Sequence, residues 1–208
     1  MHIEMTELLR CPACPRPEGR AAFLVLATAE MRGRAVQRGT VGCPVCGAEF
    51  PIRNGIVDFR EQGAGGREQT PVAPAPRSLL PAPDLQALLD LSSPGGYVVL
   101  IGDAVRQAAG LAGVLEHVHF AGINGPPDVT AAPYLSLLRA EGGIPLRDAF
   151  VRGAVVGGDA IEGPWVSEAV RVVLRGRRIV LHGAAAGTAP PGVEQLAAEG
   201  GVWVGRKV

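Results

Sequence analysis

The residues best suited to chemistry in this chain are its four cysteines, which stand in two C-x-x-C pairs: Cys11 with Cys14, and Cys43 with Cys46. Thiolates at this spacing can hold a metal ion from two sides. The 28 residues from 15 to 42 are long enough for a β-hairpin that carries the second pair across to the first. Protein ligands then fill all four positions of a tetrahedral ion. We therefore expect a structural zinc site, with no position left for a substrate.

Two other uses of the cysteines remain open. Two disulfides would need an oxidising compartment, but residues 1–7 lack the basic segment and apolar run of a signal peptide, so we expect a cytoplasmic protein. The Cys43-Pro-Val-Cys46-Gly sequence also resembles a rubredoxin knuckle, which would imply an iron centre. Few aromatic residues are available to surround such an iron, and zinc is the preferred interpretation.

Composition narrows the range of partners. Twenty basic and twenty acidic residues cancel to a formal net charge of zero, so no overall field attracts nucleic acid or an anionic membrane, and we do not expect RNA as a partner. No stretch approaches the roughly 20 apolar residues of a membrane span. With 47% hydrophobic residues the chain can build a core, and its 208 residues allow one large or two small domains.

The composition changes sharply between the two halves of the chain. Residues 61–83 are rich in glycine, proline and alanine and have neither helical nor strand periodicity, which predicts a linker. In the first half, 1–60, the runs 21–28 and 35–41 are strand candidates, and the second leads into Cys43. We expect a small β-rich zinc ribbon over 1–60 and an α/β domain over 84–208.

The second half alternates apolar runs with amphipathic segments, a pattern typical of a doubly wound, Rossmann-like sheet. The strand candidates are 97–101, 118–122, 154–156, 178–182 and 201–208. The helix candidates are 83–91, with Asp84 as its cap, and 104–115, 134–140, 166–174 and 193–198. Arg175, Arg177 and Arg178 are expected in a basic turn.

Three segments of the first half resemble the zinc-ribbon family of the tRNA methyltransferase 112 homologue, which activates methyltransferases. They are 8–14, 42–46 and 50–59, and the Phe-Pro-Ile-x-x-Gly-Ile sequence in the last is the most specific. The resemblance implies a methyltransferase or a translation-related protein as partner. Ribbons of this family add a strand to the partner's sheet edge. We therefore expect 50–59 to pack on the α/β half, within one chain or swapped between the chains of a homodimer.

Residues 84–208 resemble a class I S-adenosylmethionine methyltransferase, mainly over 144–156 and 168–181. In that family a glycine-rich turn after the first strand and an acid after the second strand hold the cofactor. These positions fall here on Gly102 with Asp103, and on Asn124. Ala104 and Arg106 replace two of the turn's glycines, and Asn124 carries no charge, so the resemblance implies a degenerate cofactor site.

The sequence therefore predicts a zinc-binding, non-catalytic interaction protein that combines an activator-like ribbon with a pseudo-methyltransferase domain. No catalytic residue is assigned. The alternative is an active S-adenosylmethionine-dependent methyltransferase acting on tRNA, rRNA or a translation factor. Methyltransferases position a reactive cofactor against a nucleophile and need little covalent help, so both interpretations stay open at this point.

Overall fold

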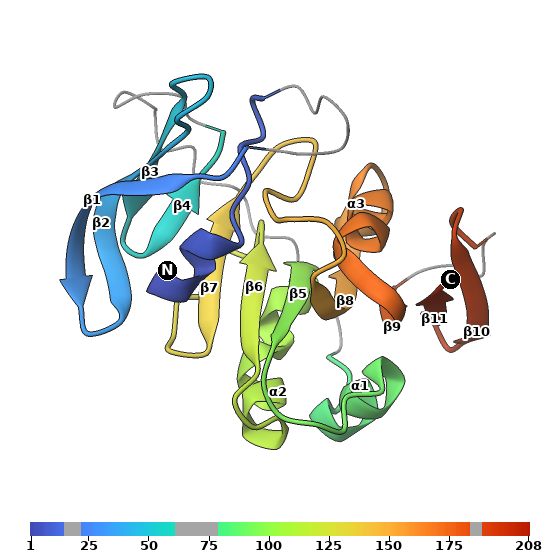
Figure 1. The fold of residues 1–208 in the computed structure, drawn as a ribbon. Helices are drawn as coiled ribbons and strands as arrows, with labels where there is room; N and C mark the ends of the chain where they lie inside the picture. Colours follow the sequence, from blue (N-terminus) through green and yellow to red (C-terminus); the bar gives the residue numbers. More distant parts are fainter. Residues whose placement is uncertain (15–21, 61–78, 184–188) are drawn as a thin grey trace.

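The structure, a computed structural model, describes residues 1–14, 22–60, 79–183 and 189–208. Within these ranges eleven strands join in one sheet with the order β1-β2-β3-β4-β7-β6-β5-β8-β9-β11-β10 (Figure 1). The strands of the first half are β1 (Val25–Arg32), β2 (Ala35–Gly42), β3 (Glu49–Arg53) and β4 (Ile56–Asp58). Those of the second half are β5 (Tyr97–Gly102), β6 (His119–Ile123), β7 (Leu135–Arg139), β8 (Val151–Gly157), β9 (Val173–His182), β10 (Val193–Glu199) and β11 (Val202–Lys207).

The strand order of the second half confirms the predicted fold class. Strands β7, β6, β5, β8 and β9 are parallel neighbours, and the β10–β11 hairpin joins β9 through the antiparallel strand β11. In chain order these strands read 3-2-1-4-5-7-6. This is a doubly wound sheet of the methyltransferase type, with β5 at the centre.

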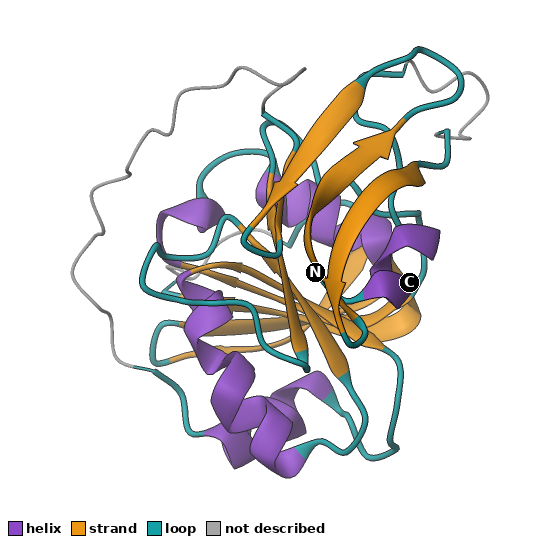
Figure 2. Cartoon of the chain, turned by 90° about the vertical axis from the view of Figure 1, so that its left-hand side faces the viewer, coloured by secondary structure: helices purple, strands orange, loops and turns teal. Residues whose placement is uncertain are grey.

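Helices lie on both sides of this sheet (Figure 2). Along β5, Val98 and Leu100 belong to one apolar cluster with α1 (Ala82–Leu89) and α2 (Ala108–Val114). Val99 and Ile101 belong to the other, with α3 (Trp165–Val172) and the N-terminal 3-10 helix η1 (Ile3–Glu7). Side chains alternate between the faces of a strand, so burial on both faces explains the unbroken apolar run of β5. No helix in the described ranges is long and apolar enough to cross a membrane.

The ribbon continues the sheet of the α/β half. Strand β4 pairs in parallel with β7, with Val57 opposite Leu138 and Asp58 opposite Arg139. Phe50 and Phe59 pack ring to ring at 5.0 Å and belong to the same buried cluster as Leu138. The expectation that 50–59 packs on the α/β half is confirmed. The cluster draws on both halves, so the second half does not have a wholly separate core.

Several sequence-based assignments need correction. Residues 134–140 and 193–198 were expected to be helices, but β7 and β10 are strands. The basic turn at 175–178 lies within β9, where Arg178 pairs with Gly153 of β8. Helix α1 begins at Ala82, so Asp84 lies in its first turn and Pro81 holds the cap position. The predicted helix 104–115 is divided into the 3-10 helix η3 (Asp103–Gln107) and α2. Most of the proposed linker 61–83 lies outside the described residues.

Candidate metal centre and ligand edge of the sheet

The structure brings all four cysteines together at the end of the ribbon. Their Sγ atoms lie within 4.8 Å of one another, with Cys11 and Cys46 3.6 Å apart and Cys14 and Cys43 3.5 Å apart. Four sulfurs bound at about 2.3 Å to a tetrahedral ion would be about 3.8 Å apart. The donor set is purely thiol and its spacing is close to this value, so the residues fit a tetrahedral metal ion.

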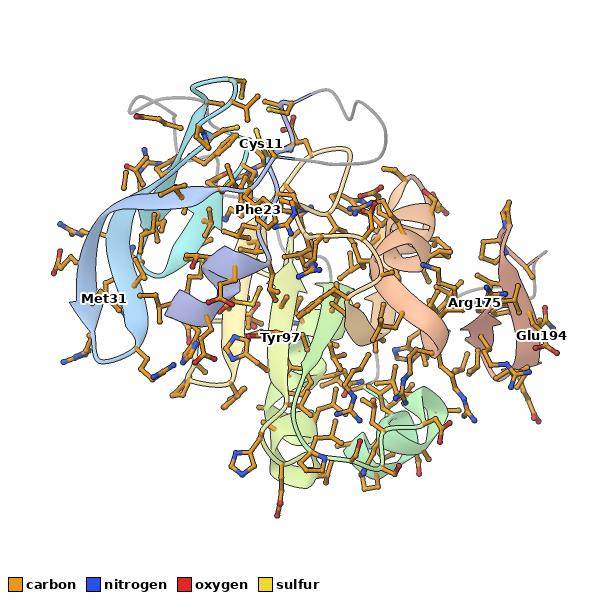
Figure 3. The ribbon with its side chains drawn as sticks, viewed as in Figure 1. Cys11, Phe23, Met31, Tyr97, Arg175 and Glu194 are labelled. Carbon is orange, nitrogen blue, oxygen red and sulfur yellow. The ribbon has the colours of Figure 1, made fainter. Side chains whose placement is uncertain are left out.

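Two separate elements hold the two cysteine pairs. Cys11 follows the single bridge between Arg10 and Phe23, and its backbone N–H donates to Ala22 at 2.9 Å. The Arg10 guanidinium lies 3.6 Å from the centroid of the Phe23 ring, so a cation–π contact supports the segment that presents Cys11. Figure 3 labels Cys11 and Phe23 near each other, beside the strands of the ribbon in the upper part of the view. Sequence reasoning missed this contact, because neither residue type signals it at this spacing.

The second pair sits in a tight turn after β2. The N–H of Cys43 donates to Ala48, and the N–H of Gly47 donates back to Cys43, with Gly47 at a positive φ of 72°. Burial opposes ionisation of Cys43, but N–H groups of Cys46 and Val45 bond its sulfur and lower the pKa of this thiol to about 7. Such hydrogen bonds favour the thiolate, which is the form that binds metals. Cys46 is exposed, whereas the other three cysteines are buried.

A second candidate region is the edge where the parallel strands end at their carboxyl termini. Gly102 closes β5 with a φ of 63° and packs against the end of β8. A Cβ added at Gly102 would lie 2.7 Å from the carbonyl oxygen of Gly157, and one at Gly157 would lie 2.9 Å from the nitrogen of Ala104. The turn after β5 is thus closed down on β8.

Asn124, the residue predicted at the ribose position, is engaged by the protein itself. Its side-chain nitrogen donates to the carbonyl of Ala140 and its side-chain oxygen accepts from the N–H of the same residue, both at 2.9 Å. Both ends of the amide therefore link the end of β6 to the end of β7. Asn124 therefore has a structural role here, with one N–H and one oxygen lone pair engaged by Ala140.

Val105 and Arg106 fill the space between the β5 turn and the end of β6. Val105 is fully buried, and a Cβ added at Gly122 or Gly125 would lie 2.9 Å from its Cγ1 atom. Arg106 forms a two-pronged ion pair with Asp128 in the loop after β6, with one N–O distance of 2.8 Å. This pair lowers the pKa of Asp128, chiefly through the hydrogen bond. The ion pair thus links the turn after β5 to the loop after β6 at the protein surface.

A cavity of about 120 Å³ lies at this edge, among the described residues. It lies at the ends of β5, β8 and β9, where its lining includes Asp103, Gly158 and His182. Cofactor and drug-like ligands generally occupy pockets of about 300 Å³ or more. The three predicted cofactor positions are therefore not brought together around one pocket: Asp103 lines this cavity, Gly102 is packed on β8, and Asn124 is bonded to β7.

Comparisons with known proteins give only distant matches. No family model and no curated protein sequence matches the chain. Among solved structures, one match is a chain from the complex between the Haloferax volcanii Trm112 methyltransferase activator and the putative methyltransferase. It is 18% identical with a TM-score of 0.40, and the match covers 49% of this chain and 50% of that one. The [4+2]-cyclase SpnF is 14% identical with a TM-score of 0.41, and the match covers 48% of this chain and 42% of SpnF. The antibiotic-resistance methyltransferase Kmr is 13% identical with a TM-score of 0.40, and the match covers 63% of this chain and 95% of Kmr.

This chain spans about half or less of the length of the Haloferax volcanii chain and of SpnF. At such identities and scores the matches do not assign a function. We therefore take the methyltransferase-like fold from the strand order of this chain.

Proposed function

We propose that this protein is a zinc-stabilised, non-catalytic interaction protein, in which an activator-like ribbon is docked permanently on a pseudo-methyltransferase domain. The observation that carries the proposal is the filled carboxyl edge of the sheet. Val105, part of the core cluster on the α1–α2 face, packs against Gly122 and Gly125 at the end of β6, and the nitrogen and oxygen of the Asn124 amide are both bonded to Ala140. A cavity of about 120 Å³ is too small for S-adenosylmethionine.

Zinc is the ion we propose for the four-cysteine centre. Zn²⁺ favours tetrahedral thiolate sites, and four protein ligands leave it no open position for catalysis. Structural zinc binding can contribute on the order of 10 kcal/mol to folding, which is large for a ribbon of this size. Cys11, Cys14, Cys43 and Cys46 would hold the ion, which would fix the N-terminal segment to the turn after β2.

We also propose that the ribbon serves its own α/β half and not a separate methyltransferase. The pairing edge of β4 is engaged by β7, and the apolar residues beside it are buried in the shared core. A ribbon in this state has no free β4 edge to offer to a second protein. Light scattering of the purified chain should therefore give the mass of a monomer, whereas a stable dimer would favour exchange of ribbons between two chains.

The central test is calorimetric titration of the zinc-loaded chain with S-adenosylmethionine and with S-adenosylhomocysteine. We expect no saturable binding of either. A triple variant, Ala104→Gly with Arg106→Gly and Asn124→Asp, is the matched comparison, because it restores the predicted cofactor residues but leaves Val105 in place. We expect it to bind no better. Micromolar binding by the unmodified chain would refute the proposal and favour an active methyltransferase.

Metal analysis provides a separate test of the zinc centre. Elemental analysis should find one zinc per chain in protein purified without chelators, and Cys43→Ser should lower this ratio to near zero. Iron in place of zinc would refute the assignment of the ion.

A further inference from the structure

The small cavity at the carboxyl edge lies where a doubly wound sheet generally places its ligands. Such sheets bind ligands at the point where the strand order reverses, outside the carboxyl ends of the strands. In this sheet the reversal falls between β5, whose chain continues to β6 on one side, and β8 on the other. The cavity of about 120 Å³ lies at that point, between Asp103 after β5 and Gly158 after β8.

Three polar side chains line this cavity, those of Asp103, His182 and Gln107. In the part of the chain that the structure describes, neither the carboxylate of Asp103 nor the imidazole of His182 has a hydrogen-bond or ion-pair partner, and both are half-buried. The guanidinium of Arg106 attracts Asp103 electrostatically, but it forms its hydrogen bonds with Asp128. Among the described residues, the Asp103 carboxylate at the cavity wall therefore has no direct partner.

Local backbone geometry fixes this carboxylate at the cavity wall. A Cβ added at Gly158 would lie 2.6 Å from Oδ2 of Asp103, and Gly158 has a φ of 66°. Glycine at this position allows the Asp103 side chain to lie directly against the backbone after β8. The remaining wall includes the apolar side chains of Leu80, Ala104 and Val155 and the buried amide of Gln107. One end of the cavity is thus acidic, and much of the rest is apolar.

We propose that this cavity binds a small organic cation, a primary ammonium group on a short branched alkyl chain. The ammonium would donate hydrogen bonds to the Asp103 carboxylate and to a ring nitrogen of His182, and the alkyl group would pack on Leu80 and Val155. An apolar cavity of about 150 Å³ holds a benzene molecule, so about 120 Å³ suits a ligand of about five heavy atoms. The ligand class is distinct from the nucleoside cofactor that the fold would suggest.

The test is a titration of the full ¹⁵N-labelled, zinc-loaded chain with isobutylammonium chloride, followed by two-dimensional NMR at constant ionic strength and mildly alkaline pH. We expect saturable shifts at the backbone amides of Gly158 and Gly183, which line the cavity. Isobutanol has the same heavy-atom skeleton without the charge. It should bind at least about tenfold more weakly, because it lacks the charge-assisted hydrogen bond to Asp103.

Variants separate this site from general charge effects. Asp103→Asn should weaken isobutylammonium binding about tenfold, and His182→Gln should weaken it to a smaller extent. Asp84→Asn makes the same chemical change on the exposed first turn of α1 and should leave binding unaltered. Shifts that do not saturate, equal binding of isobutanol, or binding unaffected by both Asp103→Asn and His182→Gln would overturn the proposal.

Discussion

Acid sensitivity at His119 is a sharp prediction of this structure. His119 begins β6, where its ring lies 5.2 Å from that of His2 and 5.8 Å from that of Tyr97, and its Nε2 is 2.9 Å from Oγ of the buried Ser136. Burial, reinforced by His2 and the N-terminal ammonium, lowers the pKa of His119 to about 4, against a weaker opposing effect of Glu4. The imidazole is therefore held neutral between η1 and the sheet.

His119 makes the protein less stable in acid, because its pKa is lower in the folded chain than in the unfolded chain. An unfolded histidine takes up its proton near pH 6.5, whereas folded His119 resists until about pH 4. Its contribution to stability is complete above about pH 6.5 and is lost as the pH falls toward 4. Between about pH 7.5 and about pH 5 the loss should be about 2 kcal/mol.

Urea unfolding of zinc-loaded wild type and of His119→Gln at these two pH values tests this estimate. The wild type should lose about 2 kcal/mol more than the variant, because all other titrating groups are common to both proteins. His117→Gln is the matched control, since His117 is exposed two positions earlier and should retain the full acid sensitivity. If wild type and His119→Gln lose equal free energy, His119 is not held neutral by burial at this contact.

Three further substitutions probe the junction and the ligand edge. Asp58→Asn breaks the two-pronged pair with Arg60 at the end of β4 and should cost about 1–3 kcal/mol in urea unfolding, because Asp58 is only 6% exposed. Phe50→Ala empties a fully buried position of the shared core and should cost about 3–5 kcal/mol, with both halves unfolding in a single transition. Gly102→Ala should lower the melting temperature, because the new Cβ would meet the Gly157 carbonyl at 2.7 Å in a left-handed conformation; an unchanged melting temperature would show that the turn is not packed on β8.

Periodicity predicted the buried strands well where their ends were marked. The run at 97–101 is short, apolar and closed by glycine, and it forms β5. Residues 135–139, with three leucines among five residues, are less apolar and are not closed by a glycine, and a short buried run of this kind reads the same as a buried helix. These residues form a strand because β4 and β6 pair with the two edges of β7.

The error at 193–198 has a different cause. Glu, Gln, Leu and Ala all favour helices, so local propensity pointed to a helix, but pairing with β11 prevails. A signal was present: Gly200 and Gly201, with φ of 58° and 77°, form a two-residue hairpin loop between Glu199 and Val202. Glycine pairs of this kind between two short runs indicate a hairpin, even where the composition favours a helix.

At the candidate sites, too, local sequence patterns predicted some features, whereas tertiary packing determined others. The meeting of four thiols could be predicted, because two C-x-x-C pairs carry their own geometry. The packing at the carboxyl edge of the α/β sheet could not be predicted in the same way. It depends on where the side chain of Val105 packs and on the bonding of Asn124 to the next strand, which no local pattern encodes.

The parallel pairing of β4 with β7 makes folding depend on a contact between distant parts of the sequence. Val57 and Leu138 are neighbours in space but 81 positions apart in the sequence. Contacts of such high sequence separation slow folding, because a long loop must close before they form. On the ribosome β4 is made well before β7, so the ribbon leaves the exit tunnel with one edge unpaired. A metal ion bound at that stage would hold the ribbon in shape until its partner strand has been synthesised.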